Sequence, residues 1–130
     1  MMKPELLSPA GSMDSLKAAV NSGCDAVYLG GKKFGARAYA GNFDLQELEE
    51  VCDYCHLRGV KVYVTVNTLI YEYEFDDCLS YIEFLHTNGV DAVIMQDIGL
   101  INITRKKYPN KLIIHTEGCT GISINRNGRQ

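Results

Sequence analysis

The sequence predicts an α/β fold with about five parallel strands and four helices. Short apolar runs alternate with segments whose apolar residues recur at helical spacing, and this alternation is typical of a parallel sheet covered by crossover helices. Gly23, Gly59 and Gly89 each join the end of a predicted helix to the next strand. They are 36 and 30 residues apart (59 − 23 and 89 − 59), about the length of one βα unit. Two architectures fit: an open, doubly wound sheet and part of a (β/α)8 barrel.

The first unit consists of a short strand and a capped helix. The strand is predicted at residues 5–7, and residues 8–11 form a tight turn into the helix. Ser12 suits the helix N-cap, and Gly23 suits the left-handed residue that ends it. The apolar face of this helix consists of Met13, Leu16, Ala19 and Val20. The second strand follows at residues 26–29.

The second helix has a well-defined start. Asp44 and Glu47 match a capping box, and Phe43 can pack on Leu48 as a hydrophobic staple. The helix is expected to run to about Arg58. The third strand, residues 61–66, follows because this stretch is rich in β-branched and aromatic residues.

Two more units complete the predicted sheet. A helix at 74–87 precedes a strand at 92–95, and a helix at 98–107, capped by Asp97, precedes a strand at 112–115. The stripe of the third helix consists of Phe75, Cys78, Leu79, Ile82 and Leu85. From Glu117 onward there is no helical stripe and little to bury, so we expect an irregular tail.

Composition indicates an ordinary globular chain. The 130 residues are 46% hydrophobic and carry a formal net charge of −3, which is normal for one domain. No apolar run approaches the roughly 20 residues of a membrane span, and residues 1–12 lack the apolar segment of a signal peptide. We therefore expect a cytoplasmic protein that does not enter a membrane.

The cysteines are predicted to be thiols. They number five, and an odd count without a secretion signal argues against a disulfide framework. Cys52 and Cys55 form a C-x-x-C, but they fall within a predicted helix in step with its apolar residues, and no second ligand pair follows. Core packing is the favoured interpretation, and we expect no metal site.

A long basic connection, residues 30–43, separates the second strand from the second helix. It contains four glycines, no acidic residue and three cations: Lys32, Lys33 and Arg37. Connections in α/β domains are usually about 2–6 residues long, so a longer one tends to be functional or disordered. Glycine amides and the start of the next helix could hold an anion; the alternative is a solvated, flexible loop. A Walker loop is excluded, because Ala36 and Arg37 stand where Lys and Ser or Thr are required.

In either architecture, the site lies beyond the carboxyl ends of the strands. The residues predicted to bind substrate there are Pro9, Gly11, Gly30, Gly31, Lys32, Lys33, Arg37, Asn67, Gln96, Asp97 and His115. Three have structural alternatives, since Asp97 can cap a helix, Asn67 can shape its turn and His115 can be a partly buried strand-end residue. His56 and His86 are expected to be structural or solvated. No catalytic residue follows from the sequence.

Three separated blocks occur in the same order in a known family. Residues 3–11 read Lys-Pro-Glu-Leu-Leu-Ser-Pro-Ala-Gly, residues 25–31 read Asp-Ala-Val-Tyr-Leu-Gly-Gly, and residues 58–68 read Arg-Gly-Val-Lys-Val-Tyr-Val-Thr-Val-Asn-Thr. From about Lys3 to His115 the chain resembles the start of the collagenase-like peptidase family, the thirty-second among peptidases of unknown mechanism. The resemblance implies the N-terminal half of a TIM-type (β/α)8 barrel.

The resemblance also implies functions. Several family members are oxygen-independent hydroxylases: some modify tRNA or rRNA with prephenate as the implied hydroxyl source, and others act in quinone synthesis and carry an iron–sulfur cluster. In the family the fifth strand usually ends in His, a small residue and Ser-Thr-Gln, whereas here residues 115–119 read His-Thr-Glu-Gly-Cys. The cluster-binding cysteines are also missing, so we expect no cofactor in this chain. We therefore expect a partial barrel over 1–116 and a tail over 117–130, as truncation or a shifted reading frame would give.

Three functions remain open. The first is the N-terminal half of an RNA-hydroxylating enzyme, inactive alone, whose basic loop meets RNA phosphate or a small anionic substrate. The second is a collagenase-like peptidase, although the sequence has no H-E-x-x-H or G-x-S-x-G motif. The third is a non-catalytic fragment. We also expect self-association through unpaired edges of the first and fifth strands.

Overall fold

A computed structural model describes residues 5–32, 43–66, 70–110, 112–116 and 122–125. The elements are β1 (Leu7–Pro9), α1 (Met13–Asn21), β2 (Ala26–Gly30), α2 (Leu45–Leu57), β3 (Lys61–Val66), the 3₁₀ helix η1 (Glu72–Glu74), α3 (Phe75–Thr87), β4 (Ala92–Met95), α4 (Ile98–Lys107), β5 (Leu112–Thr116) and β6 (Ile122–Asn125). Within these ranges, no helix is long and apolar enough to cross a membrane.

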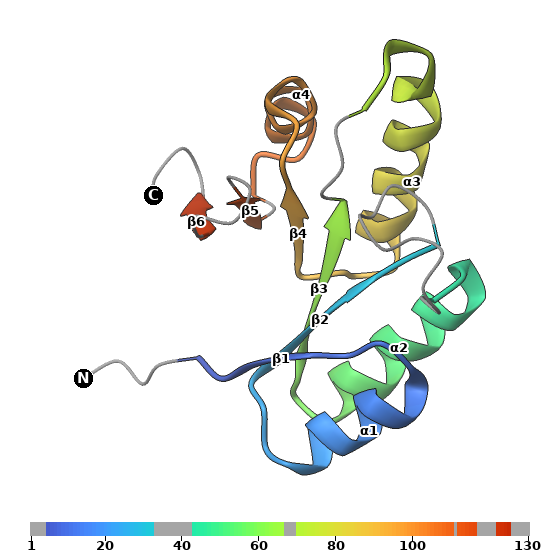
Figure 1. Cartoon of the computed structure of the whole chain (residues 1–130), viewed down its shortest axis with the longest axis vertical. Coiled ribbons are helices and arrows are strands. Elements are labelled where there is room, and N and C mark those ends of the chain that lie inside the picture. The colour runs from blue at the N-terminus through green and yellow to red at the C-terminus, as the bar shows by residue number, and fades with distance from the viewer. Residues whose placement is uncertain (1–4, 33–42, 67–69, 111, 117–121, 126–130) are drawn as a thin grey trace.

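The strands form one sheet in chain order, β1 to β6. Strands β1 to β5 are parallel, and β6 is antiparallel to β5. Figure 1 shows α1, α2 and α3 one after another along the same side of the strands. A doubly wound sheet would reverse its strand order and carry helices on both faces. The uninterrupted order and the one-sided helix layer are those of part of a (β/α)8 barrel.

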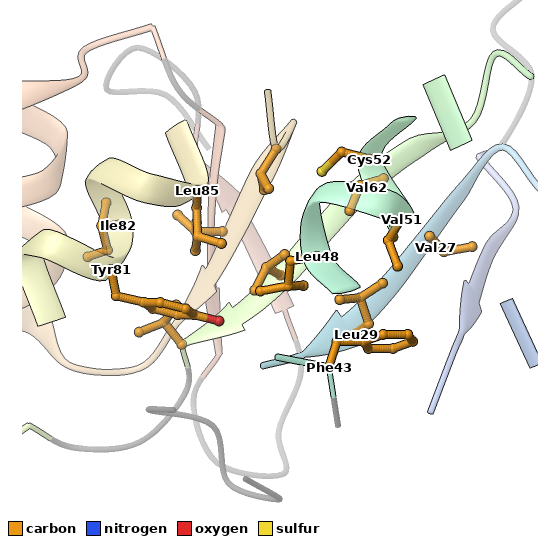
Figure 2. Packing of buried hydrophobic residues seen from close by; sticks show 14 of the residues in the cluster. Val27, Leu29, Phe43, Leu48, Val51, Cys52, Val62, Tyr81, Ile82 and Leu85 are labelled. Carbon is orange, nitrogen blue, oxygen red and sulfur yellow. The ribbon is translucent and has the colours of Figure 1, made fainter. Parts of the chain in front are cut away.

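The main core lies between the sheet and the helices. On β3, Val62, Val64 and Val66 are fully buried in this core, whereas Tyr63 points to the other face of the sheet. Figure 2 shows part of the cluster, with side chains from β2, α2, β3 and α3 meeting one another. The buried helix residues are Leu16 from α1, Leu48, Val51, Cys52 and Cys55 from α2, Cys78, Tyr81, Ile82 and Leu85 from α3, and Leu100 and Ile101 from α4. The predicted stripes of α1 and α3 face this core, because their remaining members are partly buried and pack against it: Met13, Ala19, Val20, Phe75 and Leu79.

A smaller cluster covers the opposite face of the sheet, which would face the barrel interior. Its buried members are Ala26, Tyr63, Ala92 and Ile94, and Leu7 and Tyr28 pack against them. The Tyr63 hydroxyl donates to the Glu5 carboxylate and lies 2.8 Å from Oε1 and 2.9 Å from Oε2. The chain's own side chains therefore bury much of this face.

The predicted helix ends are present. Gly23, Gly59 and Gly89 have φ angles of 90°, 74° and 82°, the left-handed region in which glycine is favoured. The Ser15 amide donates to Ser12 Oγ at 3.1 Å. Asp44 and Glu47 form the reciprocal capping box.

Strand β1 begins two residues later than predicted. Ser8 and Pro9, expected in a turn, lie in the strand opposite Val27 and Tyr28 of β2. The pairing extends one residue beyond the strand, because the Ala10 amide donates a hydrogen bond to the Tyr28 carbonyl oxygen at 3.0 Å. Proline is tolerated here because β1 is an edge strand.

The expectation of an irregular tail was wrong for residues 122–125. These residues form β6, which pairs with β5 from Thr116 opposite Ile122 to Ile113 opposite Asn125. An uncovered strand edge accepts any segment that can adopt an extended conformation. The fifth strand is consequently paired on both sides, contrary to prediction. The division of the chain at residue 116 stays a prediction.

Candidate functional site

The carboxyl ends of β1 to β5 lie at one edge of the sheet because these strands are parallel. We call this the strand-end edge. Pro9 ends β1 and Gly11 follows it, and Gly30 ends β2 and is followed by Gly31 and Lys32. The edge also contains Gln96 and Asp97 after β4, and His115 near the end of β5. Backbone pairing sets His115 opposite Met95. Lys33, Arg37 and Asn67 lie outside the described residues.

The two ends of the basic loop are joined at this edge. The Phe43 amide donates to the Gly30 carbonyl oxygen at 3.2 Å, and the Lys32 amide donates to the Phe43 carbonyl oxygen at 3.0 Å. Phe43 is 2% exposed, while Lys32 is exposed. Burial of Phe43 therefore fixes the start and the end of the loop, and Lys32 stands in solvent beside them.

Tyr81 packs directly beneath Gly31. A methyl group added at Gly31 would collide with the Tyr81 hydroxyl and lie 3.5 Å from Leu48 Cδ1. Figure 2 shows the Tyr81 hydroxyl pointing from α3 toward Leu48 of α2. Glycine is thus required here for close approach rather than for backbone conformation. Sequence reasoning left Tyr81 out, although it lies three residues after Cys78 and four before Leu85, on the same helical face.

Asp97 acts as a helix cap and as a tie between two connections. Its Oδ1 accepts the Leu100 amide at 3.0 Å, and its Oδ2 accepts the Ile70 amide at 3.1 Å. The capping role is the one that the sequence favoured. The bond to Ile70 additionally holds the connection before η1 against the start of α4.

The described cysteines are unsuited to nucleophilic or metal chemistry. Cys24, Cys52, Cys55 and Cys78 are buried thiols rather than members of disulfides. Burial raises the pKa of Cys55 to about 11 and that of Cys78 to about 12, so both are neutral thiols at physiological pH. The core interpretation of the C-x-x-C is confirmed. Within the described ranges, no cluster of His, Cys, Asp and Glu side chains could hold a metal ion.

A histidine–aspartate pair lies at the opposite edge, where the strands begin. His56 Nε2 is 2.7 Å from Asp91 Oδ2, which also accepts the Val62 amide at 2.8 Å. In the same way, Asp25 accepts the Leu6 amide at 2.7 Å. Both aspartates therefore join the start of one strand to the start of its neighbour.

An open cleft of about 430 Å³ lies at this strand-start edge. It is lined by His86, Gly89, Val90, Asp91, Lys107, Tyr108, Pro109 and Asn110. The cleft and the His56–Asp91 pair are thus separated from the strand-end edge by the length of the sheet. Neither brings the predicted site residues together.

Comparison with known proteins decides the family. The sequence profile of Peptidase family U32 matches residues 11–123. The chain belongs to Peptidase family U32. A solved structure described as that of the U32 peptidase Mk0906 has a TM-score of 0.70 at 15% identity, over 89% of this chain and 51% of that one. At this identity the likeness shows the shared fold.

Curated relatives in Peptidase family U32 differ in their described activities. The chain is 38% identical over 108 residues to tRNA hydroxylation protein P1 of Bacillus subtilis, covering 83% of this chain and 26% of that protein. It is 40% identical over 99 residues to the 23S rRNA 5-hydroxycytidine synthase of Escherichia coli, covering 76% and 15%. It is 32% identical over 121 residues to a collagenase of Porphyromonas gingivalis, covering 92% and 28%. The chain therefore spans between 15% and 28% of the length of these relatives.

Proposed function

We propose that this chain is the N-terminal part of a cytoplasmic enzyme that hydroxylates tRNA or rRNA without oxygen, using prephenate as the hydroxyl source. The observation that carries the proposal is the similarity to RNA hydroxylation proteins from several organisms. Because the chain spans only part of their length, we further propose that it has no turnover alone.

The geometry of the strand-end edge is consistent with an anionic substrate. Lys32 is exposed at the fixed base of a loop that also contains Lys33 and Arg37. Cations on a glycine-rich connection suit RNA phosphate or the carboxylates of a small acid. Asp97 uses both carboxylate oxygens in backbone hydrogen bonds, so we assign it to holding the edge together rather than to proton transfer.

The iron–sulfur cluster of some relatives does not fit the described residues. Cys24, Cys52, Cys55 and Cys78 are buried within the helix-side core, and burial raises the pKa of three of these thiols. Cluster ligands must be thiolates. No step of the proposed reaction therefore runs through a cluster held by these residues.

A peptidase is the second candidate, favoured by the similarity to a collagenase. The structure offers this function no evident nucleophile and base in the described ranges. The four cysteines in the described part of the chain are buried, and the His56–Asp91 pair lies at the strand-start edge. Peptide hydrolysis needs both groups within reach of one carbonyl carbon.

The test is a comparison of total tRNA and rRNA from cells with and without the gene that encodes this chain. Mass spectrometry of the nucleosides should show one hydroxylated nucleoside missing from the deletion strain and restored by complementation. Cells unable to make prephenate should lose the same nucleoside. Unchanged RNA, together with gelatin cleavage by the purified full-length protein, would establish the peptidase instead.

A further inference from the structure

An exposed pair of tyrosines stands at the strand-end edge. Tyr71 directly precedes η1 and Tyr73 lies within it, and the two residues are 68% and 82% exposed. Their ring centroids are 5.7 Å apart and their planes differ by 5°. The Asp97–Ile70 hydrogen bond ties the connection just before η1 to the start of α4. We call Tyr71 and Tyr73 the aromatic shelf.

The surroundings of the shelf are acidic. Residues 71–77 read Tyr-Glu-Tyr-Glu-Phe-Asp-Asp, with four carboxylates and no cation. Glu74 caps η1 by accepting the Tyr71 amide, and the acids near the start of α3 suit its helix dipole. Glu72, Asp76 and Asp77 are exposed, and no ion pair joins them to a cation in the described ranges. The helix dipole accounts for the position of the acidic residues at the start of α3, but it does not account for the exposure of the two tyrosine rings.

Tyrosines elsewhere in the chain show what these rings can bind. The Arg58 guanidinium lies 3.7 Å from the Tyr54 ring centroid, and Lys17 Nζ lies 5.7 Å from the same ring. Lys107 Nζ lies 5.6 Å from the Tyr108 ring. Both rings are thus already beside cations of the chain itself. At the shelf, in contrast, the described chain supplies carboxylates and no cation.

We propose that the aromatic shelf docks an arginine-bearing segment of a protein partner. A guanidinium can stack on a tyrosine face and at the same time donate to a neighbouring carboxylate. Arginine suits the site better than lysine, because a planar guanidinium approaches a ring more closely, as Arg58 does on Tyr54. RNA suits it less, because the carboxylates of residues 72–77 repel phosphates. The proposal does not depend on the proposed function.

The experiment measures binding of fluorescein-labelled (Gly-Arg)4, (Gly-Lys)4 and (Gly-Glu)4 peptides to the full chain by fluorescence anisotropy at low salt. We expect the arginine peptide to bind most tightly and the glutamate peptide not to bind. The double variant Y71A/Y73A should weaken arginine-peptide binding about 3- to 10-fold, whereas Y71F/Y73F keeps the rings and should leave it within about 2-fold. Circular dichroism checks that the variants are folded.

A matched charge variant separates the shelf from general attraction to an acidic protein. D76N/D77N removes two charges beside the shelf, and E49Q/E50Q removes two exposed charges from α2. We expect only D76N/D77N to weaken binding. Equal loss in both variants, or full binding by Y71A/Y73A, would overturn the proposal. Tyrosine-dependent binding of a single-stranded RNA oligonucleotide would also overturn it. So would light scattering that shows a dimer of the intact chain and a monomer of Y71A/Y73A.

Discussion

Gly31 shows how one missing side chain can determine the packing of the strand-end edge. The Tyr81 hydroxyl occupies the space that a Cβ would take. We expect Gly31→Ala to destabilise the fold by about 1–3 kcal/mol through overpacking. Removing the hydroxyl with Tyr81→Phe should recover part of the loss, because the ring carbon at 3.1 Å still crowds the methyl group.

Urea unfolding of the four members of this cycle measures the coupling. Gly11→Ala is the control, since nothing lies within 4 Å of a Cβ there. It should change the free energy of unfolding by less than about 0.5 kcal/mol. Additive effects of the Gly31 and Tyr81 changes would show that the two residues do not compete for one space.

The buried thiol of Cys78 makes stability depend on alkaline pH. Burial raises its pKa from 9.0 to about 12, so above pH 9 the unfolded chain releases this proton and the folded chain keeps it. The stabilisation is complete below pH 9 and falls as the pH rises toward 12. Urea unfolding at pH 7 to 11 should show the stability advantage over Cys78→Ala shrinking above pH 9. A difference in unfolding free energy between the two proteins that stays constant from pH 7 to 11 would contradict this prediction.

At the scale of single elements, Asp97 differs from an ordinary helix cap. Asp97→Ala should cost about 0.5–2 kcal/mol through loss of the α4 cap, and it should also expose the Ile70 amide to solvent exchange. Asp44→Ala removes the α2 cap without touching that amide. Hydrogen exchange should therefore show faster exchange at Ile70 in the Asp97 variant alone. Equal protection in both variants would mean that the tie is not formed in solution.

The proposed function predicts that the basic loop contacts RNA phosphates in the full-length protein. The triple variant K32A/K33A/R37A should weaken RNA binding and make the slope of log affinity against log salt shallower by up to about 0.7–0.9 per lost contact. The matched control, R105A/K106A/K107A, removes the same charge from the last turn of α4, at the strand-start edge. A slope changed equally by both variants would leave the loop with a small carboxylate ligand or none.

Elements defined by local chemistry were predictable from the sequence. The bounds of β3, β4 and α4 agree with those expected, because β-branched runs, glycine ends and the Asp97 cap each act within a few residues. The start of β1 depends on its register with β2, and β6 depends on a free edge of β5. Asp97 was recognisable as a cap, but its bond to Ile70 joins residues 27 positions apart. Contacts of that range carry no local sequence pattern.

At the scale of the whole molecule, we expect the distribution of strand edges to decide whether copies of the chain associate. Strand β1 is three residues long and contains Pro9, and short, proline-containing edges pair poorly with other chains. The edge of β5 is covered by β6. Self-association, which stays a prediction, should therefore depend on β6.

A chain ending at Thr116 tests this dependence. Without β6, the hydrogen-bonding groups on one side of β5 would face solvent, and such edges are templates for pairing between chains. Light scattering over a concentration series should give a higher average mass for this chain than for the intact one. A chain ending at Asn125 keeps β6 and should behave like the intact chain. If all three chains scatter alike, β6 does not protect the β5 edge, and association must arise elsewhere on the molecule.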